Sequence, residues 1–418
     1  MTLRANQLEA LSDALAAVLP LTEPSDTALH QFFRKHTKLG QQDRAFIADG
    51  VFATLRRLRS LTAQAESGAP RPLAIGVTLR DLGLSMRELD GALSAPERAW
   101  ATAFRARKPS LTPAEAAELP DWLWTRLGAA FAADELDALT RAWLTPAPLD
   151  LRVNTMLGTR DAAWAALAAS GISAEATPYS PLGLRIAGRP ALQQHPLFKS
   201  GAIEVQDEGS QLVGYLVAPK RTDMVVDFCA GAGGKTLLLG ALMRSQGRLY
   251  AFDVAQKRLA RLKPRLARSG LSNVQPTLIQ NERDTHVKRL ARKIDRVLVD
   301  APCTGFGTLR RNPDLKWRQT VTGIGELTAK QTRILAAAAT MVKPGGRLVY
   351  ATCSVLPEEN EAIVDAFLAA HPQFAMGNAA AELARAGISL DTGATLKLYP
   401  HRHGCDGFFA AVLERAPA

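Results

Sequence analysis

The sequence predicts an α/β protein in which a doubly wound, Rossmann-like domain (222–418) follows an all-α domain (1–145) and a small α+β module (146–221). Three observations support this prediction. Apolar residues recur at helical spacing through the first part, strand-like alternation begins at Leu149, and apolar strands then alternate with helical stretches. A chain of 418 residues is long enough for each part to bury its own core.

The first part is expected to be helical throughout. Helical periodicity covers residues 5–18 and 43–62, and a helix or helix pair is expected over 122–143. The segment Thr112-Pro-Ala-Glu115 has the pattern of a capping box with proline at the first helical position. Residues 68–72 are rich in glycine and proline and are expected to form a loop.

The second part combines short strands with one clear helix. Residues 149–154 alternate as a strand does, and residues 159–170 read as a helix that ends at Gly171. Short apolar segments follow at 182–186 and 202–205. This pattern indicates a small α+β module.

The third part shows a regular alternation of strands and helices. Strands are expected near 224–228, 248–252, 296–300 and 347–352. Strands separated by helices form a parallel, doubly wound sheet, and ligands bind beyond the carboxyl ends of its strands. The residues with the most distinctive chemistry lie at those ends.

Charge and cysteine content restrict the class of protein. Lys and Arg outnumber Asp and Glu by 51 to 40, which favours a polyanionic partner but is equally consistent with a basic surface that only maintains solubility. Four scattered cysteines form neither a disulfide framework nor a zinc site, so we expect a cytoplasmic protein without bound metal. No apolar run is long enough for a membrane span.

A glycine-rich turn follows the first strand of the third part, in the segment Cys229-Ala-Gly-Ala-Gly-Gly-Lys-Thr236. A phosphate-binding loop of the Walker type would need glycine at Cys229, and a dinucleotide fingerprint would need glycine at Thr236. The loop of a methyltransferase needs only the short glycine cluster, and the segment fits this requirement. Asp253 ends the next strand, where a carboxylate can accept both ribose hydroxyls, although a helix N-cap or a dehydrogenase would also use an acid there.

Two cysteines follow two other strands. Cys303 comes directly after the strand ending at Asp300, and Cys353 comes after the strand ending at Thr352. Cytosine carbon 5 reacts with a methyl donor only after a thiolate has added to carbon 6, and a base must later remove the carbon 5 proton. One cysteine would attack and the other would assist release, while Asp300 would contact the base edge or the amino acid end of a cofactor. The residues alone leave the two cysteine roles interchangeable.

The chain resembles the bacterial RNA cytosine-5 methyltransferases of the Sun/Nop/ribosomal small-subunit methyltransferase B type. Five motifs in order carry the resemblance: Val205–Ser210, Asp227–Thr236, Asp300–Gly305 with Arg310–Trp317, Tyr350–Asn360, and Asp406–Phe409. The resemblance implies a class I methyltransferase domain that binds S-adenosylmethionine. It also implies that Cys353 is the nucleophile and that Cys303 aids product release.

The same resemblance assigns the cofactor contacts. They fall on Cys229, Ala230, Gly231, Ala232, Gly233, Gly234 and Lys235, together with Asp253, Asp284 and Asp300. Asp284 is our choice for the acid near the adenine, with Glu282 as the alternative. The amino-terminal segment from Leu39 to Arg57 is similar to a shortened, antitermination-factor-like RNA-binding domain.

Expected RNA contacts follow the motif that contains Cys303. Arg310, Arg311 and Lys316 are positioned in the sequence to bind phosphates around an unpaired or flipped cytosine. We expect a monomer that does not bind membranes and that modifies 16S ribosomal RNA. The same chemistry on tRNA and a catalytically inactive ribosome-assembly factor remain alternatives, and an NAD-linked oxidoreductase would leave both cysteines unused.

Overall fold

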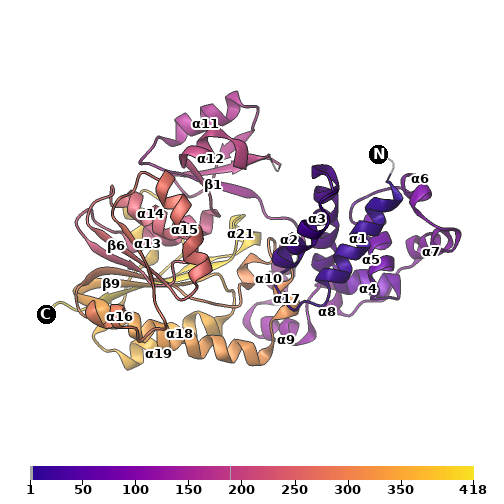
Figure 1. Ribbon diagram of the computed structural model, residues 1–418. Coiled ribbons are helices and arrows are strands. Elements are labelled where there is room, and N and C mark those ends of the chain that lie inside the picture. The colour runs from indigo at the N-terminus through magenta and orange to yellow at the C-terminus, as the bar shows by residue number, and fades with distance from the viewer. Residues whose placement is uncertain (1–2, 189) are drawn as a thin grey trace. The chain divides into compact units, whose positions relative to one another are not determined.

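The computed structural model describes residues 3–188 and 190–418. The chain forms two compact units, which Figure 1 colours along the sequence. The helical unit contains Met1–Pro146 and the segment Thr308–Val321, and the sheet unit contains Ala147–Gly307 and Thr322–Ala418. The sequence did not indicate that residues 308–321 would join the amino-terminal helices. Within the described part of the chain, no helix has the length and apolarity needed to cross a bilayer.

The helical unit is built on a bundle in which α1, α3 and α5 contact one another. Leu8, Leu11 and Leu15 of α1 and Ile47, Val51 and Leu55 of α3 are fully buried, as the helical spacing predicted, and Trp317 packs against the same core. The elements of this unit are α1 (Ala5–Val18), α2 (Ser25–Lys35), α3 (Gln41–Arg56), α4 (Leu58–Ala65), α5 (Pro70–Arg80), α6 (Met86–Leu89), η1 (Asp90–Ala92), α7 (Ala95–Ala106), α8 (Pro113–Ala116), α9 (Asp121–Ala130), α10 (Ala133–Trp143) and α17 (Leu315–Arg318).

Two local expectations for this unit need correction. Residues 43–62 form two helices, α3 and α4, because the backbone leaves helical geometry at Arg57 and the Glu118 carboxylate accepts the N–H groups of Arg59 and Ser60. The expected loop over 68–72 is confirmed only for residues 68–69, because α5 already begins at Pro70. Proline is well suited to this position because the first helical N–H has no intrahelical partner. The expected capping box at Thr112 and Glu115 is confirmed.

The sheet unit contains a small antiparallel sheet with strand order β2-β3-β1-β4. Its helices bury the apolar residues of one sheet face in a separate small core. The elements are β1 (Leu149–Val153), α11 (Arg160–Ala169), β2 (Ala174–Ala176), β3 (Gly183–Ile186), η2 (Leu192–Gln194), α12 (Pro196–Ser200) and β4 (Ile203–Val205).

The larger sheet has the order β10-β12-β9-β8-β5-β6-β7, and β11 pairs with β12. Strands β9, β8, β5, β6 and β7 are parallel, whereas β12, β10 and β11 run antiparallel to their neighbours. The elements are α13 (Glu208–Val217), β5 (Met224–Asp227), α14 (Gly234–Leu242), β6 (Arg248–Asp253), α15 (Gln256–Arg268), β7 (Val274–Leu278), α16 (Thr285–Arg289), β8 (Ile294–Asp300), η3 (Phe306–Thr308), α18 (Val321–Met341), β9 (Val342–Thr352), η4 (Pro357–Glu359), α19 (Glu361–Ala370), β10 (Phe374–Met376), α20 (Ala379–Arg385), β11 (Leu396–Leu398), α21 (Pro400–His403) and β12 (Phe408–Arg415).

Helices cover both faces of the large sheet (Figure 1). One core contains residues of α13, α14, α15 and α20, and the other contains residues of α16, α18 and α19. The doubly wound α/β class is therefore confirmed. Because β5, β6, β8 and β9 are parallel, Asp227, Asp253, Asp300 and Cys353 all lie at the same edge of the sheet.

Candidate active site

The glycine-rich turn after β5 is held in shape by the acid that ends β6. Asp253 accepts hydrogen bonds from the N–H groups of Gly231 and Ala255, at 2.8 and 2.6 Å. Gly233 has a φ of 83°, and a Cβ at this position would lie 2.2 Å from the Leu262 side chain. Glycine is therefore required at Gly233 both for its backbone conformation and for the close packing of α15.

A cavity of ≈ 650 Å³ opens at this edge of the sheet. Ten residues of the predicted cofactor and catalytic set line this cavity: Cys229, Ala230, Gly231, Ala232, Gly234, Lys235, Asp253, Asp300, Cys303 and Cys353. A cavity of this size, with a close-approaching backbone and an acid at the second strand end, fits a nucleoside-bearing cofactor.

Other parts of the cavity wall were not identified from the sequence. Gln206 contributes from the loop before α13, Ser210 contributes from the first turn of α13, and Lys330 and Ile334 contribute from α18. Gln206 belongs to the motif Val205–Ser210, but the sequence indicates no specific role for its amide. Lys330 and Ile334 carry no motif signal that distinguishes them from other residues of an amphipathic helix.

An ion pair connects the first turn of α14 to the end of β8. Lys235 Nζ lies 2.8 Å from the Asp300 carboxylate, and the lysine side chain is only 9% exposed. Burial opposes the charged amine, but the charges of Asp300 and then of Cys353 raise the pKa of Lys235 above its ordinary value. Behind this pair, burial raises the pKa of Asp227 to about 7, although the carboxylate accepts a hydrogen bond from Thr236.

The two cysteines of the strand ends lie side by side. Their Sγ atoms are 3.4 Å apart, and both side chains line the cavity and are half-buried. The hydrogen bond with Cys353, followed by burial and by the charges of Cys353 and Glu359, raises the pKa of Cys303 well above its ordinary value. The raised pKa favours the thiol form of Cys303, whereas Cys353 interacts electrostatically with the Lys235 side chain.

The choice of Asp284 as a cofactor ligand needs correction. Asp284 is the N-cap of α16, where its carboxylate accepts hydrogen bonds from the backbone of Gln280 and His286. These hydrogen bonds lower the pKa of Asp284. Within the described residues, Glu282 lines the cavity and Asp284 does not, so the structure favours the alternative acid.

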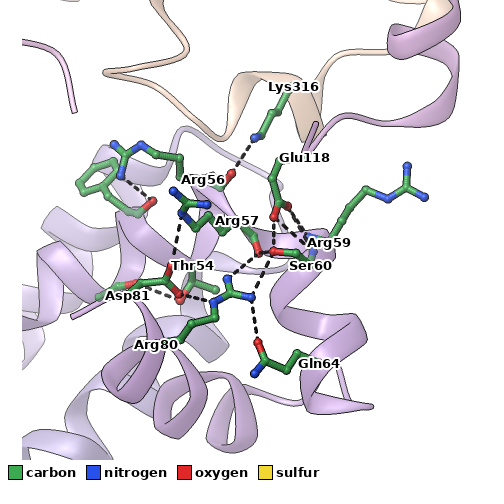
Figure 2. A network of polar contacts seen from close by, with 12 residues as sticks. Thr54, Arg56, Arg57, Arg59, Ser60, Gln64, Arg80, Asp81, Glu118 and Lys316 are labelled. Atoms are coloured by element: carbon green, nitrogen blue, oxygen red, sulfur yellow. Dashed lines mark hydrogen bonds and ion pairs between the residues drawn. The ribbon is translucent and has the colours of Figure 1, made fainter. Parts of the chain in front are cut away.

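The expected RNA contacts of Lys316 and Arg310 also need correction. Lys316 is 3% exposed and donates a hydrogen bond to the backbone oxygen of Arg56 at 2.9 Å, as Figure 2 shows. Burial lowers the pKa of Lys316 to about 7, despite the opposing charge of Glu118. Arg310 is 6% exposed, and its backbone oxygen accepts a hydrogen bond from Arg56. Neither side chain is placed for a phosphate, while contact through the half-buried Arg311 stays a prediction.

Taken together, the sheet topology and the cavity define an S-adenosylmethionine-dependent methyltransferase. The chain belongs to the RsmB/F family of 16S rRNA methyltransferases, whose family model matches residues 214–414. A model of the RsmF/B-like ferredoxin-like domain matches residues 119–193.

Individual relatives agree with this assignment. The chain is 32% identical to the probable ribosomal RNA small subunit methyltransferase B of Synechocystis, over 94% of this chain and 95% of that protein. It is also 32% identical to ribosomal RNA small subunit methyltransferase B of Sodalis glossinidius, over 90% of each chain. Among solved structures, PH0851 superposes with a TM-score of 0.81 at 27% identity, over 99% of this chain and 100% of that one. A methyltransferase homologue from Pyrococcus horikoshii gives 0.62 at 28% identity, over 73% of this chain and 100% of that one.

Proposed function

We propose that this protein forms 5-methylcytosine in 16S ribosomal RNA, with Cys353 as the nucleophile and Cys303 as the residue that assists release. The observation that carries the proposal is the pair of cysteine sulfurs, 3.4 Å apart, on the wall of the cavity. A methyl transfer to a nitrogen or oxygen atom would not require two thiols. The names of the relatives support ribosomal RNA of the small subunit as the substrate.

The different surroundings of the sulfurs support the division of roles. Cys353 interacts electrostatically with the Lys235 side chain, and this contact supports Cys353 as the nucleophile toward cytosine carbon 6. Cys303 keeps its proton beside Cys353 and Glu359. After methylation a base takes the carbon 5 proton as the bond between carbon 6 and Cys353 breaks, and the adjacent Cys303 thiol can stabilise the departing Cys353 thiolate by hydrogen bonding.

The remaining residues bind and orient. Bound S-adenosylmethionine supplies an electrophilic methyl group. Asp253 offers carboxylate oxygens to ribose hydroxyls, and the backbone of Gly231 and Ala232 allows close approach. Asp300, fixed by Lys235, faces the cavity and can contact the cytosine edge. The target base must be unpaired or flipped, because a thiolate cannot reach carbon 6 inside a stacked helix.

Bisulfite sequencing of total RNA from cells with and without the gene tests this proposal. We expect one cytosine of 16S ribosomal RNA to lose its protection when the gene is absent. Loss of protection in a tRNA instead would retain the chemistry and change the substrate. No lost site in any RNA would contradict the proposed activity and favour a non-catalytic role in ribosome assembly.

A further inference from the structure

A fully buried carboxylate lies between the two cysteine loops. Glu359, in η4, has an exposed fraction of 0%. Its Oε1 accepts hydrogen bonds from the backbone N–H of Thr304 at 2.9 Å and from the Gln331 amide at 3.0 Å. Its Oε2 accepts hydrogen bonds from the hydroxyls of Thr304 and Ser354, each at 2.5 Å. Four donors around one carboxyl group suit the ionised form, which only accepts.

The donors connect Glu359 to both sides of the reacting pair. Thr304 follows Cys303, and Ser354 follows Cys353. The third donor, Gln331 of α18, also bonds the backbone oxygen of Pro302, the residue before Cys303. The neighbouring Asn360 completes the arrangement, since it accepts a hydrogen bond from Thr352 and donates one to the Ser354 oxygen. The residues on each side of each cysteine are thus tied to the Glu359-Asn360 pair or to Gln331.

We propose that Glu359 is a positioning residue for methyl transfer, whose carboxylate holds the loops of Cys303 and Cys353 together. Among the described residues Glu359 does not line the cavity, so it acts through its neighbours rather than on substrate. Loss of the carboxylate would leave buried donors unsatisfied and let the sulfurs move apart. A displacement of about 1 Å in reacting groups costs about 100-fold in rate.

The charge of Glu359 can be measured through its effect on the pKa of Cys303. Its sulfur faces Cys353 from the β9 loop and Glu359 from η4, while Gly305 donates a backbone hydrogen bond and the Tyr350 phenol lies close enough to interact. Cys353 and Glu359 both disfavour a Cys303 thiolate. Replacing Glu359 with a neutral group of the same shape removes one of these two effects.

The experiment compares three variants of the full chain. Glu359→Gln removes the charge, Thr304→Val removes one donor but keeps the carboxylate, and Glu358→Gln removes a neighbouring charge as the control. Alkylation of Cys303 and Cys353 by iodoacetamide is followed by mass spectrometry between about pH 6 and about pH 10, without RNA. We expect Glu359→Gln to move the Cys303 midpoint to lower pH, and Thr304→Val to accelerate Cys303 alkylation at an unchanged midpoint. The control should do neither.

A kinetic arm, which rests on the proposed function, measures methylation of the RNA target. Glu359→Gln should lower kcat about 100-fold with the KM for S-adenosylmethionine unchanged. The proposal is overturned if Glu359→Gln alkylates as the parent does. If Glu359→Gln does not fold, Thr304→Val provides the test. The proposal is then overturned if Cys303 of Thr304→Val is alkylated at the same rate as in the parent. Because alkylation needs no RNA, its result is independent of whether the parent methylates cytosine.

Discussion

At the scale of single residues, the two cysteines differ more in their neighbours than in their positions. Each follows a parallel strand of the same sheet, yet Cys303 faces Glu359 while Cys353 interacts with Lys235. The sequence left the two roles interchangeable because it shows which residues follow a strand but not which charges surround them. The structure supplies these charges and therefore a physical reason for two distinct thiols.

This difference predicts distinct outcomes for the two alanine variants. Cys353→Ala should abolish turnover because no thiolate can add to carbon 6. Cys303→Ala should still add to the base but should release it slowly, so a covalent protein–RNA complex should accumulate. Denaturing gel electrophoresis with labelled RNA measures the complex, and the double variant is the control. If Cys353→Ala traps RNA instead, the roles are reversed.

The acids around the cavity allow a second prediction. Asp253→Asn removes charge-assisted hydrogen bonding worth about 1.5–3 kcal/mol, so the Kd for S-adenosylmethionine should rise roughly 10- to 150-fold. Glu282→Gln should weaken binding by a smaller factor, because Glu282 lines the cavity without supporting the glycine loop. Asp284→Asn is the matched control and should leave the Kd unchanged. Calorimetric titration measures all three, and weaker binding only in Asp284→Asn would restore the original assignment.

The residues that the sequence misassigned share one physical cause. Asp284 and Glu282 are separated by one position, and an acid in such a loop suits an N-cap as well as a ligand. Lys316 and Arg310 are cations beside a reactive motif, but their burial depends on helices more than 200 positions away in the chain. Residue type and local pattern predict the chemistry of a side chain well, but they do not predict which side chains are buried by segments distant in the sequence.

At the scale of elements, two glycines let the strand ends come together. Gly307 donates its N–H to the backbone oxygen of Cys353, and Gly407 donates to the oxygen of Gly307. A Cβ on Gly307 would lie 2.0 Å from the Gly407 oxygen and 2.8 Å from the Cys353 oxygen. The closing motif Asp406–Phe409 is therefore part of the reacting centre's support, because β12 pairs beside the end of β9.

Gly307→Ala should consequently disturb the site through the backbone. Neither contacted atom belongs to a flexible side chain, so the Cys353 strand end must shift. We expect a loss of about 1–3 kcal/mol in stability and a fall in kcat greater than that in cofactor affinity. Gly325→Ala is the control, since a Cβ there meets no atom within 4 Å. Thermal unfolding and single-turnover methylation measure both effects, and equal behaviour of the two variants would contradict the close approach.

Much of the architecture at this scale could be predicted from the sequence. The periodic strands at 224–228, 248–252 and 296–300 became β5, β6 and β8. The antiparallel strands β10 to β12 were not predicted, because their pairing with β9 depends on contacts distant in sequence. The start of α5 was missed because proline ends some segments and begins helices in others.

At the scale of the whole molecule, the helical unit is discontinuous in sequence. The segment 308–321 supplies Trp317 to its core, and Trp317 Nε1 donates to the backbone oxygen of Leu55 at 2.7 Å. Asp314 accepts a hydrogen bond from the N–H of Ser25. Because Cys303 lies only five residues before Thr308, the chain that leaves the reacting loop completes the fold of the other unit. The stability of the helical unit thus depends on this segment.

Because Lys316 of this segment is buried, the stability of the helical unit should depend on pH. Its pKa falls from 10.5 to about 7 on folding, chiefly because burial disfavours the charged amine. Between these two pH values the unfolded chain binds more protons than the folded chain, so the free energy of unfolding should rise as pH increases. This gain in the free energy of unfolding is complete above about pH 10.5 and absent below about pH 7.

Lys316→Met should remove this pH-dependent rise. Five of the six tryptophans belong to the helical unit, so urea unfolding followed by tryptophan fluorescence reports mainly on it. Between about pH 7.5 and about pH 9.5, the parent should gain stability while the variant stays level. Burial raises the pKa of the partner Glu118, so the comparison is repeated in a Glu118→Gln background. There too, the free energy of unfolding should rise with pH when Lys316 is present and should stay level in Lys316→Met. A parent without a rising slope would mean that Lys316 keeps its charge in the folded unit, held there by Glu118.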